Sequence, residues 1–202
     1  MPDANSSMTL TLGGTDSDYS WNINGTAAVL PSVPVFLSGG EYGFEGASIT
    51  DQVTVASVEV NEVVDILIEN SDTMMTHPFH LHGHEFWVLG MTTSKDEELV
   101  QVSDPVPRDT VNVPSMGKTL IRVKFDNPGP WIFHCHIDLH LVAGMAMVFM
   151  VGDPQSDWPI PDQQTRLCGG TQDFVEMFQN PWSVSLLQIE AGRVGSNSTF
   201  RA

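Results

Sequence analysis

The chain has 202 residues, a length that allows one domain with a substantial hydrophobic core. Its formal charge of −17 makes the surface acidic, which argues against binding to nucleic acid or to an anionic membrane surface. No apolar run reaches the length of a membrane-spanning helix, and two cysteines are too few for a disulfide framework.

Alternating apolar and polar residues run along much of the chain, and this period of two predicts β-strands. In 119–125, for example, Ile121, Val123 and Phe125 share one face. The predicted strands, in chain order, are 8–12, 53–60, 63–69, 119–125, 131–136 and 143–151. Segments rich in Gly, Pro, Asn and Asp separate them. Many short strands with such turns predict an all-β fold, an antiparallel sandwich or barrel.

The composition changes after Asp153, and residues 154–202 are predicted to be a loop-rich tail behind a domain that spans 1–153. Three N-x-S/T sequons, at Asn5, Asn24 and Asn197, fit a secreted, glycosylated surface. The first residues nevertheless lack the charged and apolar regions of a secretory signal. Both observations are satisfied if the chain is a fragment of a longer secreted protein.

All seven histidines lie in two short clusters, which a chance distribution would not produce. The first cluster is HPFHLHGH, residues 77–84, and the second is WIFHCHIDLHLVAGM, residues 131–145. The histidines are His77, His80, His82 and His84 in the first cluster and His134, His136 and His140 in the second. The second cluster also holds Cys135 and Met145, so both clusters predict metal binding.

Strand geometry predicts a copper site on the Cys135 side of the second cluster. If 131–136 is extended, Cys135 points to the opposite face from its two histidine neighbours. After a short turn His140 can fold back to the Cys135 side, and Met145, at the start of the next strand, can reach the same place. A blue-copper site needs two His, one Cys and a weak axial Met, and His77 is the natural candidate for the second His.

Four further imidazoles are expected on the side away from Cys135. His80 and His82 are two residues apart and therefore share a face of an extended strand. Together with His134 and His136 they form a group without interspersed carboxylates, and such a ligand set favours copper.

These motifs resemble the C-terminal cupredoxin domain of the multicopper oxidases, nearest to fungal laccases and similar to ascorbate oxidases. The resemblance covers roughly residues 8–153 and includes N-I-N-G at 22–25, R-D-T-V at 108–111 and D-N-P-G-P-W at 126–131. It implies a cupredoxin-like Greek-key β-sandwich or barrel with a C-terminal loop-rich tail, in which 1–153 is the third domain of a longer oxidase.

The resemblance also implies a role for each ligand. His77, Cys135 and His140 correspond to ligands of the type 1 copper, with Met145 in the axial position; His80 corresponds to a type 2 ligand; His82, His134 and His136 correspond to type 3 ligands. Cys135 and His140 are expected to be catalytic, because electrons would pass through the exposed edge of His140 and then through the H-C-H tripeptide. The axial thioether predicts a low-to-moderate reduction potential. His84 has no ligand position in the family pattern and is expected to be structural.

The implied function is laccase-like: one-electron oxidation of phenolic or aromatic small molecules, coupled to four-electron reduction of dioxygen to water at a trinuclear copper cluster. Ascorbate oxidase and ferroxidase activities of the same family remain alternatives. The isolated chain could also act as a blue-copper electron-transfer domain without oxidase activity, because it supplies only half of the cluster.

The missing half is expected to come from N-terminal cupredoxin domains of the same enzyme. Completion between identical subunits is excluded, because the histidine motifs of that half occur nowhere in the chain. Cys168 resembles a cysteine that is disulfide-bonded to the first domain in fungal laccases, and the chain itself offers it no partner if Cys135 binds copper.

Overall fold

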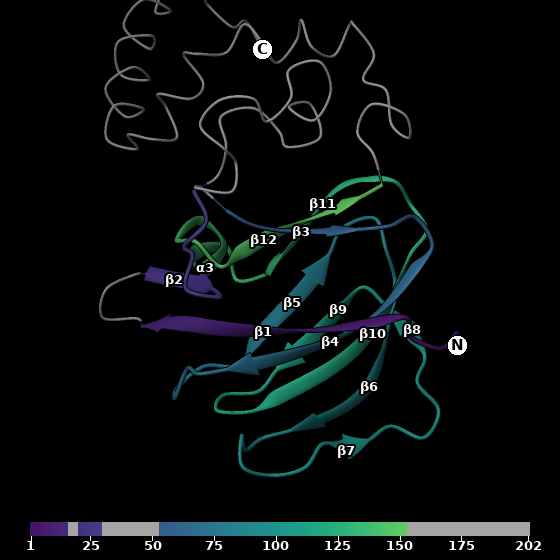
Figure 1. The fold of residues 1–202 in the computed structure, drawn as a ribbon. Helices are drawn as coiled ribbons and strands as arrows, with labels where there is room; N and C mark the ends of the chain where they lie inside the picture. Colours follow the sequence, from purple (N-terminus) through teal and green to yellow (C-terminus); the bar gives the residue numbers. More distant parts are fainter. Residues whose placement is uncertain (16–19, 30–52, 153–202) are drawn as a thin grey trace, which may run out of the picture.

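The computed structural model describes residues 1–15, 20–29 and 53–152 (Figure 1). Within these residues the chain forms strands and one short helix, α3 (Asp138–Val142). The strands are β1 (Ser6–Thr15), β2 (Ser20–Ile23), β3 (Thr54–Val58), β4 (Glu62–Asn70), β5 (His77–Leu81), β6 (Phe86–Thr92), β7 (Val100–Gln101), β8 (Pro107–Arg108), β9 (Thr110–Val113), β10 (Lys118–Phe125), β11 (Gly129–Cys135) and β12 (Ala146–Val151). The predicted tail and Cys168 lie outside the described residues.

The strands form two sheets that pack as the layers of a β-sandwich (Figure 1). One sheet has the order β2-β1-β4-β10-β6-β7, with β8 also paired to β6, and the other has the order β3-β12-β11-β5-β9. The expected all-β sandwich is confirmed. Its sheets are mixed rather than purely antiparallel, because β1 runs parallel to β4 and β3 runs parallel to β12.

The sandwich core follows from the alternation in the central strands. In β10 every second residue is buried, and the same holds for most of β4. These side chains meet three fully buried phenylalanines of the opposite sheet, Phe79, Phe133 and Phe149. Each fully buried aliphatic or aromatic side chain contributes about 1.5–3 kcal/mol. The outer face of the sheet that contains β4 and β10 is polar, and Arg122 of β10 forms a two-pronged ion pair there with Asp65 of β4.

Strand β12, in the sheet that carries the histidines, is covered on both faces. All six residues of β12 are buried. Met147, Phe149 and Val151 belong to the sandwich core, whereas Ala146, Val148 and Met150 form a second apolar cluster on the other side with Ala28 and Val53. Burial on both faces fixes the register of this sheet, since a slipped strand would move apolar side chains out of both clusters.

Two predicted element boundaries are wrong at the second histidine cluster. The last predicted strand starts at Ala146 rather than at Ala143, because α3 and its C-terminal turn occupy the residues before it. The predicted short turn before His140 is this helix, which contains His140. No helix within the described residues is long and apolar enough to cross a membrane.

Candidate metal centre

The pairing of β5 with β11 brings the two histidine clusters together. The strands are antiparallel, and their register places His134 opposite His80 and Cys135 opposite Phe79. His134 and His80 therefore lie on one face of the sheet, and Cys135 lies on the other. The predicted separation of the cysteine from its histidine neighbours is present in this register.

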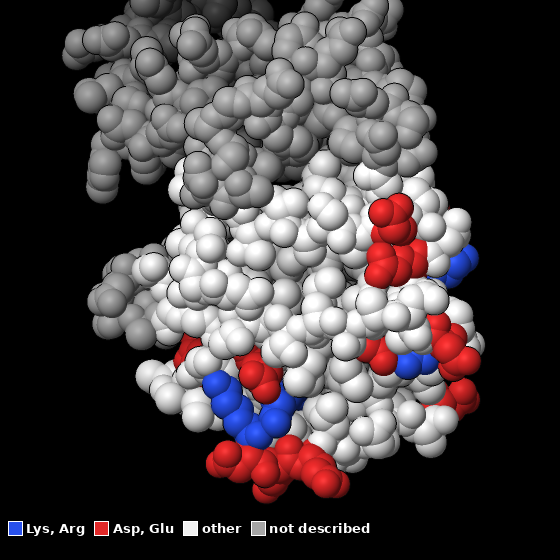
Figure 2. Space-filling model, in the orientation of Figure 1, with Lys and Arg blue, Asp and Glu red and all other residues white. Residues whose placement is uncertain are grey.

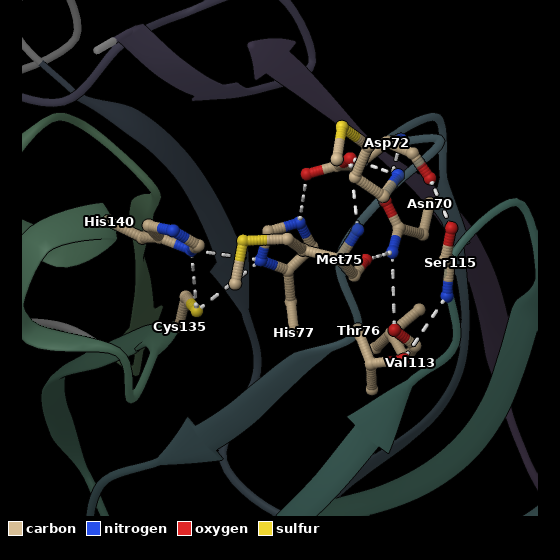
Figure 3. A network of polar contacts seen from close by, with 10 residues as sticks. Asn70, Asp72, Met75, Thr76, His77, Val113, Ser115, Cys135 and His140 are labelled. Atoms are coloured by element: carbon tan, nitrogen blue, oxygen red, sulfur yellow. Dashed lines mark hydrogen bonds and ion pairs between the residues drawn. The ribbon is translucent and has the colours of Figure 1, made fainter. Parts of the chain in front are cut away.

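On the Cys135 face, three donor atoms converge. The Nδ1 atoms of His77 and His140 are 3.0 Å apart, and each is 3.7 Å from the Sγ atom of Cys135. All three side chains are buried. Figure 3 shows them pointing toward one another from β5, from the end of β11 and from α3.

These distances fit a copper ion. Ligand bonds of about 2.0–2.1 Å to nitrogen and about 2.3 Å to sulfur, as at zinc sites, separate N and S donors in a trigonal plane by about 3.8 Å. Both S···N distances are close to this value. The 3.0 Å between the two Nδ1 atoms is shorter, so the two imidazoles move apart slightly when an ion enters. Two imidazoles and a thiolate form the donor set of blue-copper sites.

Met145 is buried beside this group, and its backbone closes the ligand loop. Its N–H donates to the carbonyl of His140 at 2.9 Å, and its carbonyl accepts from the N–H of Cys135 at 3.0 Å. Its side chain is 1% exposed and lies in the sandwich core. The loop therefore holds Cys135 and His140 at a fixed separation, and the thioether side chain is buried in the same core cluster as Cys135.

Burial has a clear electrostatic effect on the cysteine. Desolvation raises the pKa of Cys135 to about 11, although the backbone N–H of Ile137 works in the opposite direction. Without a metal the side chain is therefore a neutral thiol near neutral pH. Because metals bind the thiolate, an incoming ion must displace this proton.

A carboxylate fixes the orientation of His77. The Nε2–H of His77 donates to Oδ2 of Asp72 at 3.1 Å, which leaves the Nδ1 lone pair facing Cys135. Burial alone would raise the pKa of Asp72, but hydrogen bonds from the backbone N–H groups of Met74 and Met75, together with His77, lower it overall. A carboxylate behind a histidine ligand is a recurrent arrangement at metal sites, where it sets the tautomer and the ring direction.

Asp72 is itself held by a polar network (Figure 3). Its backbone N–H donates to Oδ1 of Asn70, and its carbonyl accepts from Oγ of Ser115. Asn70 is fully buried and donates to the carbonyls of Met75 and Val113. The network anchors the turn before β5 to the end of β9 and so fixes the carboxylate that orients His77.

The four remaining predicted ligands form one group on the opposite face. The ring centroids of His80 lie 4.9 Å from His82, and 5.7 Å from both His134 and His136. The Nε2 atoms of His82 and His134 are 3.1 Å apart. His134 is buried, whereas His82 and His136 are exposed. The group is therefore shielded from solvent at His134 and accessible to solvent at His82 and His136.

Hydrogen bonds select the Nε2 atoms of this group for a metal. The Nδ1–H of His80 donates to the carbonyl of Asp109 at 2.9 Å, and the Nδ1–H of His134 donates to the carbonyl of Cys135 at 2.9 Å. A carbonyl only accepts, so each Nδ1 carries the proton and each Nε2 has a lone pair. Desolvation and neighbouring histidines lower the pKa of His82 and His134, which keeps both imidazoles neutral and ready to bind metal.

Two observations on single histidines complete the site. His140 is 2% exposed, so the expectation that its edge reaches solvent is wrong for this chain. His84 is buried against Phe125 and Trp131, as expected of a structural residue. Its Nδ1–H donates to the carbonyl of His82, and its Nε2 is buried without a partner among the described residues.

The structure adds Trp21, which the sequence motifs did not indicate. Its indole ring stacks on the imidazole of His140, with centroids 4.2 Å apart and planes inclined by 22°. Asp72 is the second residue without a signal in the sequence. Trp21 contacts His140 from a distant strand, and Asp72 contacts His77 through the folded turn before β5, so only the tertiary fold reveals both contacts.

A β-sandwich with a buried His-Cys-His group on one side of a strand and four imidazoles on the other defines a cupredoxin-type copper domain. The sequence pattern of the multicopper oxidase family matches residues 3–155. The chain belongs to this family, and copper is its cofactor.

Relatives with three different activities resemble the chain. L-ascorbate oxidase of Cucurbita pepo var. melopepo is 42% identical over 137 residues, which cover 63% of this chain and 24% of that enzyme. Laccase-5 of Trametes versicolor is 37% identical over 176 residues, 78% of this chain and 33% of that enzyme. The crystal structure of Fet3p, a multicopper oxidase that functions in iron import, superposes with a TM-score of 0.66 at 26% identity, over 84% of this chain and 36% of that one. The cupredoxin-like fold is thereby confirmed, and the chain spans about a quarter to a third of these relatives.

Proposed function

We propose that the chain is the third cupredoxin domain of a secreted, laccase-like oxidase, with residues 1–153 as the domain. The full enzyme oxidises phenolic or aromatic molecules one electron at a time and reduces dioxygen to water. The observation that carries this proposal is the register of β5 with β11. It sets the Cys135 group directly behind four imidazoles, as two coupled redox sites require.

The ligands are proposed as the family pattern assigns them. His77, Cys135 and His140 hold the type 1 copper with Met145 as axial ligand, His80 serves the type 2 copper, and His82, His134 and His136 serve the type 3 pair. The convergent donor atoms, the buried thioether and the Nε2 lone pairs support these roles. When bound, copper supplies the one-electron redox chemistry and the dioxygen chemistry.

The protein itself connects the two groups of ligands and holds the ligand side chains in fixed positions. Cys135 links the two faces through its own backbone, because the carbonyl of Cys135 accepts the Nδ1–H of His134. The Asp72 carboxylate holds His77, and the closed loop from His140 to Met145 fixes the thiol. A site held so firmly changes little between two oxidation states, which favours fast electron transfer.

The exposed histidines point to the missing partner. His82 and His136 present open imidazoles, and the chain covers only a third or less of the ascorbate oxidase and laccase relatives. The N-terminal cupredoxin domains of the same enzyme would cover this face and complete the cluster. A disulfide from Cys168 to the first of them belongs to the same proposal. Secretion and glycosylation are supported by the sequons, of which Asn24 is exposed at the β2 turn.

Ascorbate and ferrous iron remain alternative reductants, because an ascorbate oxidase and an iron-transport oxidase are also relatives. The full-length enzyme would separate them by its kcat/KM for a phenol, ascorbate and Fe²⁺. The isolated chain is proposed to act only as a blue-copper electron-transfer domain.

The first test is copper binding to the reduced, purified chain. One copper per chain with an intense thiolate-to-copper absorption band, absent in Cys135→Ser, supports the type 1 assignment. Copper uptake that is unchanged in Cys135→Ser would contradict it. A gain in dioxygen consumption on addition of the N-terminal domains, absent in His134→Ala, tests the second site.

A further inference from the structure

Trp21 lies far from both histidine clusters in sequence and contacts a proposed copper ligand face to face. The indole and the His140 imidazole are 4.2 Å apart at 22°, which is stacking geometry. Trp21 is 1% exposed and His140 is 2% exposed. The stack therefore shields one side of the imidazole from water.

The backbone around Trp21 is built to hold this stack. The N–H of Trp21 donates to the carbonyl of Ala143, at the C-terminal end of α3, and the N–H of Ala28 donates to the carbonyl of Gly144. These two hydrogen bonds attach the segment from Trp21 to Ala28 to the turn that follows His140. Gly144 has φ +115°, and a Cβ at this position would lie 2.5 Å from the carbonyl oxygen of Trp21. The close approach requires glycine there.

The choice of tryptophan has a cost that points to its role. Among the described residues the buried Nε1–H of Trp21 has no acceptor. A buried donor without an acceptor destabilises the folded chain. Phenylalanine would fill the core without this cost, so packing alone does not explain an indole here. The extended aromatic face over His140 is the feature that tryptophan provides.

We propose that Trp21 is a positioning residue of the type 1 copper, which sets the plane of the His140 imidazole and keeps water from that side of the ion. The inference rests on the proposed ligand role of His140. The oxidised site carries one more positive charge than the reduced site, so a dry, apolar neighbour favours the reduced form and raises the reduction potential. Loss of the indole therefore lowers the potential.

The test compares Trp21→Leu with Trp21→Phe in the whole chain loaded with copper. Trp21→Leu should shift the redox equilibrium toward the oxidised form about tenfold, or about 59 mV for a one-electron couple. Trp21→Phe keeps an aromatic face and should stay within about twofold of the wild type, with the blue band preserved. Trp87→Leu is the matched control, because Trp87 lies in β6, four strands away from β2 in the same sheet, and pairs with Arg122 of β10 rather than with a ligand strand.

A measurement on the metal-free chain separates the stack from the copper chemistry. The ring protons of His140 should resonate upfield in the wild type and in Trp21→Phe, and lose this shift in Trp21→Leu. A wild-type blue site whose potential and spectrum are unchanged in Trp21→Leu overturns the inference alone. A wild-type chain that forms no blue site overturns the ligand assignment and the inference with it.

Discussion

Asp72 and His77 form a hydrogen bond of 3.1 Å between a carboxylate oxygen and the imidazole nitrogen that faces away from Cys135. The bond fixes which His77 nitrogen carries the proton, and the ionised carboxylate makes the other nitrogen a stronger donor to a metal. Asp72 receives two further backbone hydrogen bonds, so its position does not depend on the metal.

We therefore expect Asp72→Ala to weaken copper binding by about 10–100-fold, the usual effect of removing such a partner. Asp72→Asn keeps a hydrogen-bond acceptor without the charge, so its copper affinity should lie between that of Asp72→Ala and that of the wild type. A competition titration against a chelator measures both. Asp65→Asn is the control, because it removes a carboxylate whose partner, Arg122, lies away from the site. Equal copper affinity in Asp72→Ala and wild type would contradict this role.

Copper uptake should strengthen with pH because of the Cys135 thiol. Burial raises its pKa from 9.0 to about 11, so the metal must displace a proton throughout the neutral range. Between pH 7 and 9 the apparent affinity should rise about tenfold per pH unit from this proton. Competition titrations at three pH values test the slope. A flat profile would mean that the thiol is not a ligand.

The metal-free chain should lose stability as the pH falls below 6.5. The pKa values of His82, His84 and His134 are lowered, mainly by desolvation, so the unfolded chain takes up protons before the folded chain does. The free energy of unfolding consequently decreases from pH 6.5 downward until the folded pKa values are reached. Urea unfolding at pH 7.5 and 5.5 measures the change, and it should be smaller in His134→Gln. Equal or greater stability at pH 5.5 would contradict the expectation.

Gly144, in the turn after α3, and Gly25, in the turn after β2, both have positive φ, so Gly25 is a control for substitution of Gly144. Gly144→Ala should destabilise the chain by about 1–2 kcal/mol from backbone strain and by a further ~1–3 kcal/mol from crowding, since its Cβ would meet Trp21 and Ala27. Gly25→Ala has φ +81° and open space around the Cβ, so only the strain applies. Urea midpoints of both variants provide the comparison. Equal losses would show that the contact with Trp21 can relax.

The structural features that follow from a period of two residues in the sequence were predictable. The alternation in β10 defines its buried face, and the H-x-H spacings of His80 and His134 define which imidazoles share a side, since a period of two is local information. Helix α3 has only five residues, too few for a helical period, so the sequence pattern predicts a turn there instead. The parallel pairing of β1 with β4 depends on distant contacts.

The contacts of Asp72 with His77 and of Trp21 with His140 were also not predictable, because they too depend on the tertiary fold. Asp72 reaches His77 through a turn whose shape depends on Asn70 and on β9. Trp21 reaches His140 from a strand more than a hundred residues earlier. An isolated aspartate or tryptophan carries no signal for such a contact, because nothing in its neighbourhood in the chain specifies its partner.

The register of β11 against β5 has a consequence for how the protein can vary. Deletion of one residue between Trp131 and His134 would exchange the two sides of the strand for every residue beyond it. The thiol would then join the imidazoles, and two imidazoles would enter the sandwich core. A length change that leaves both groups of ligands in place is therefore expected in a loop and not within β11.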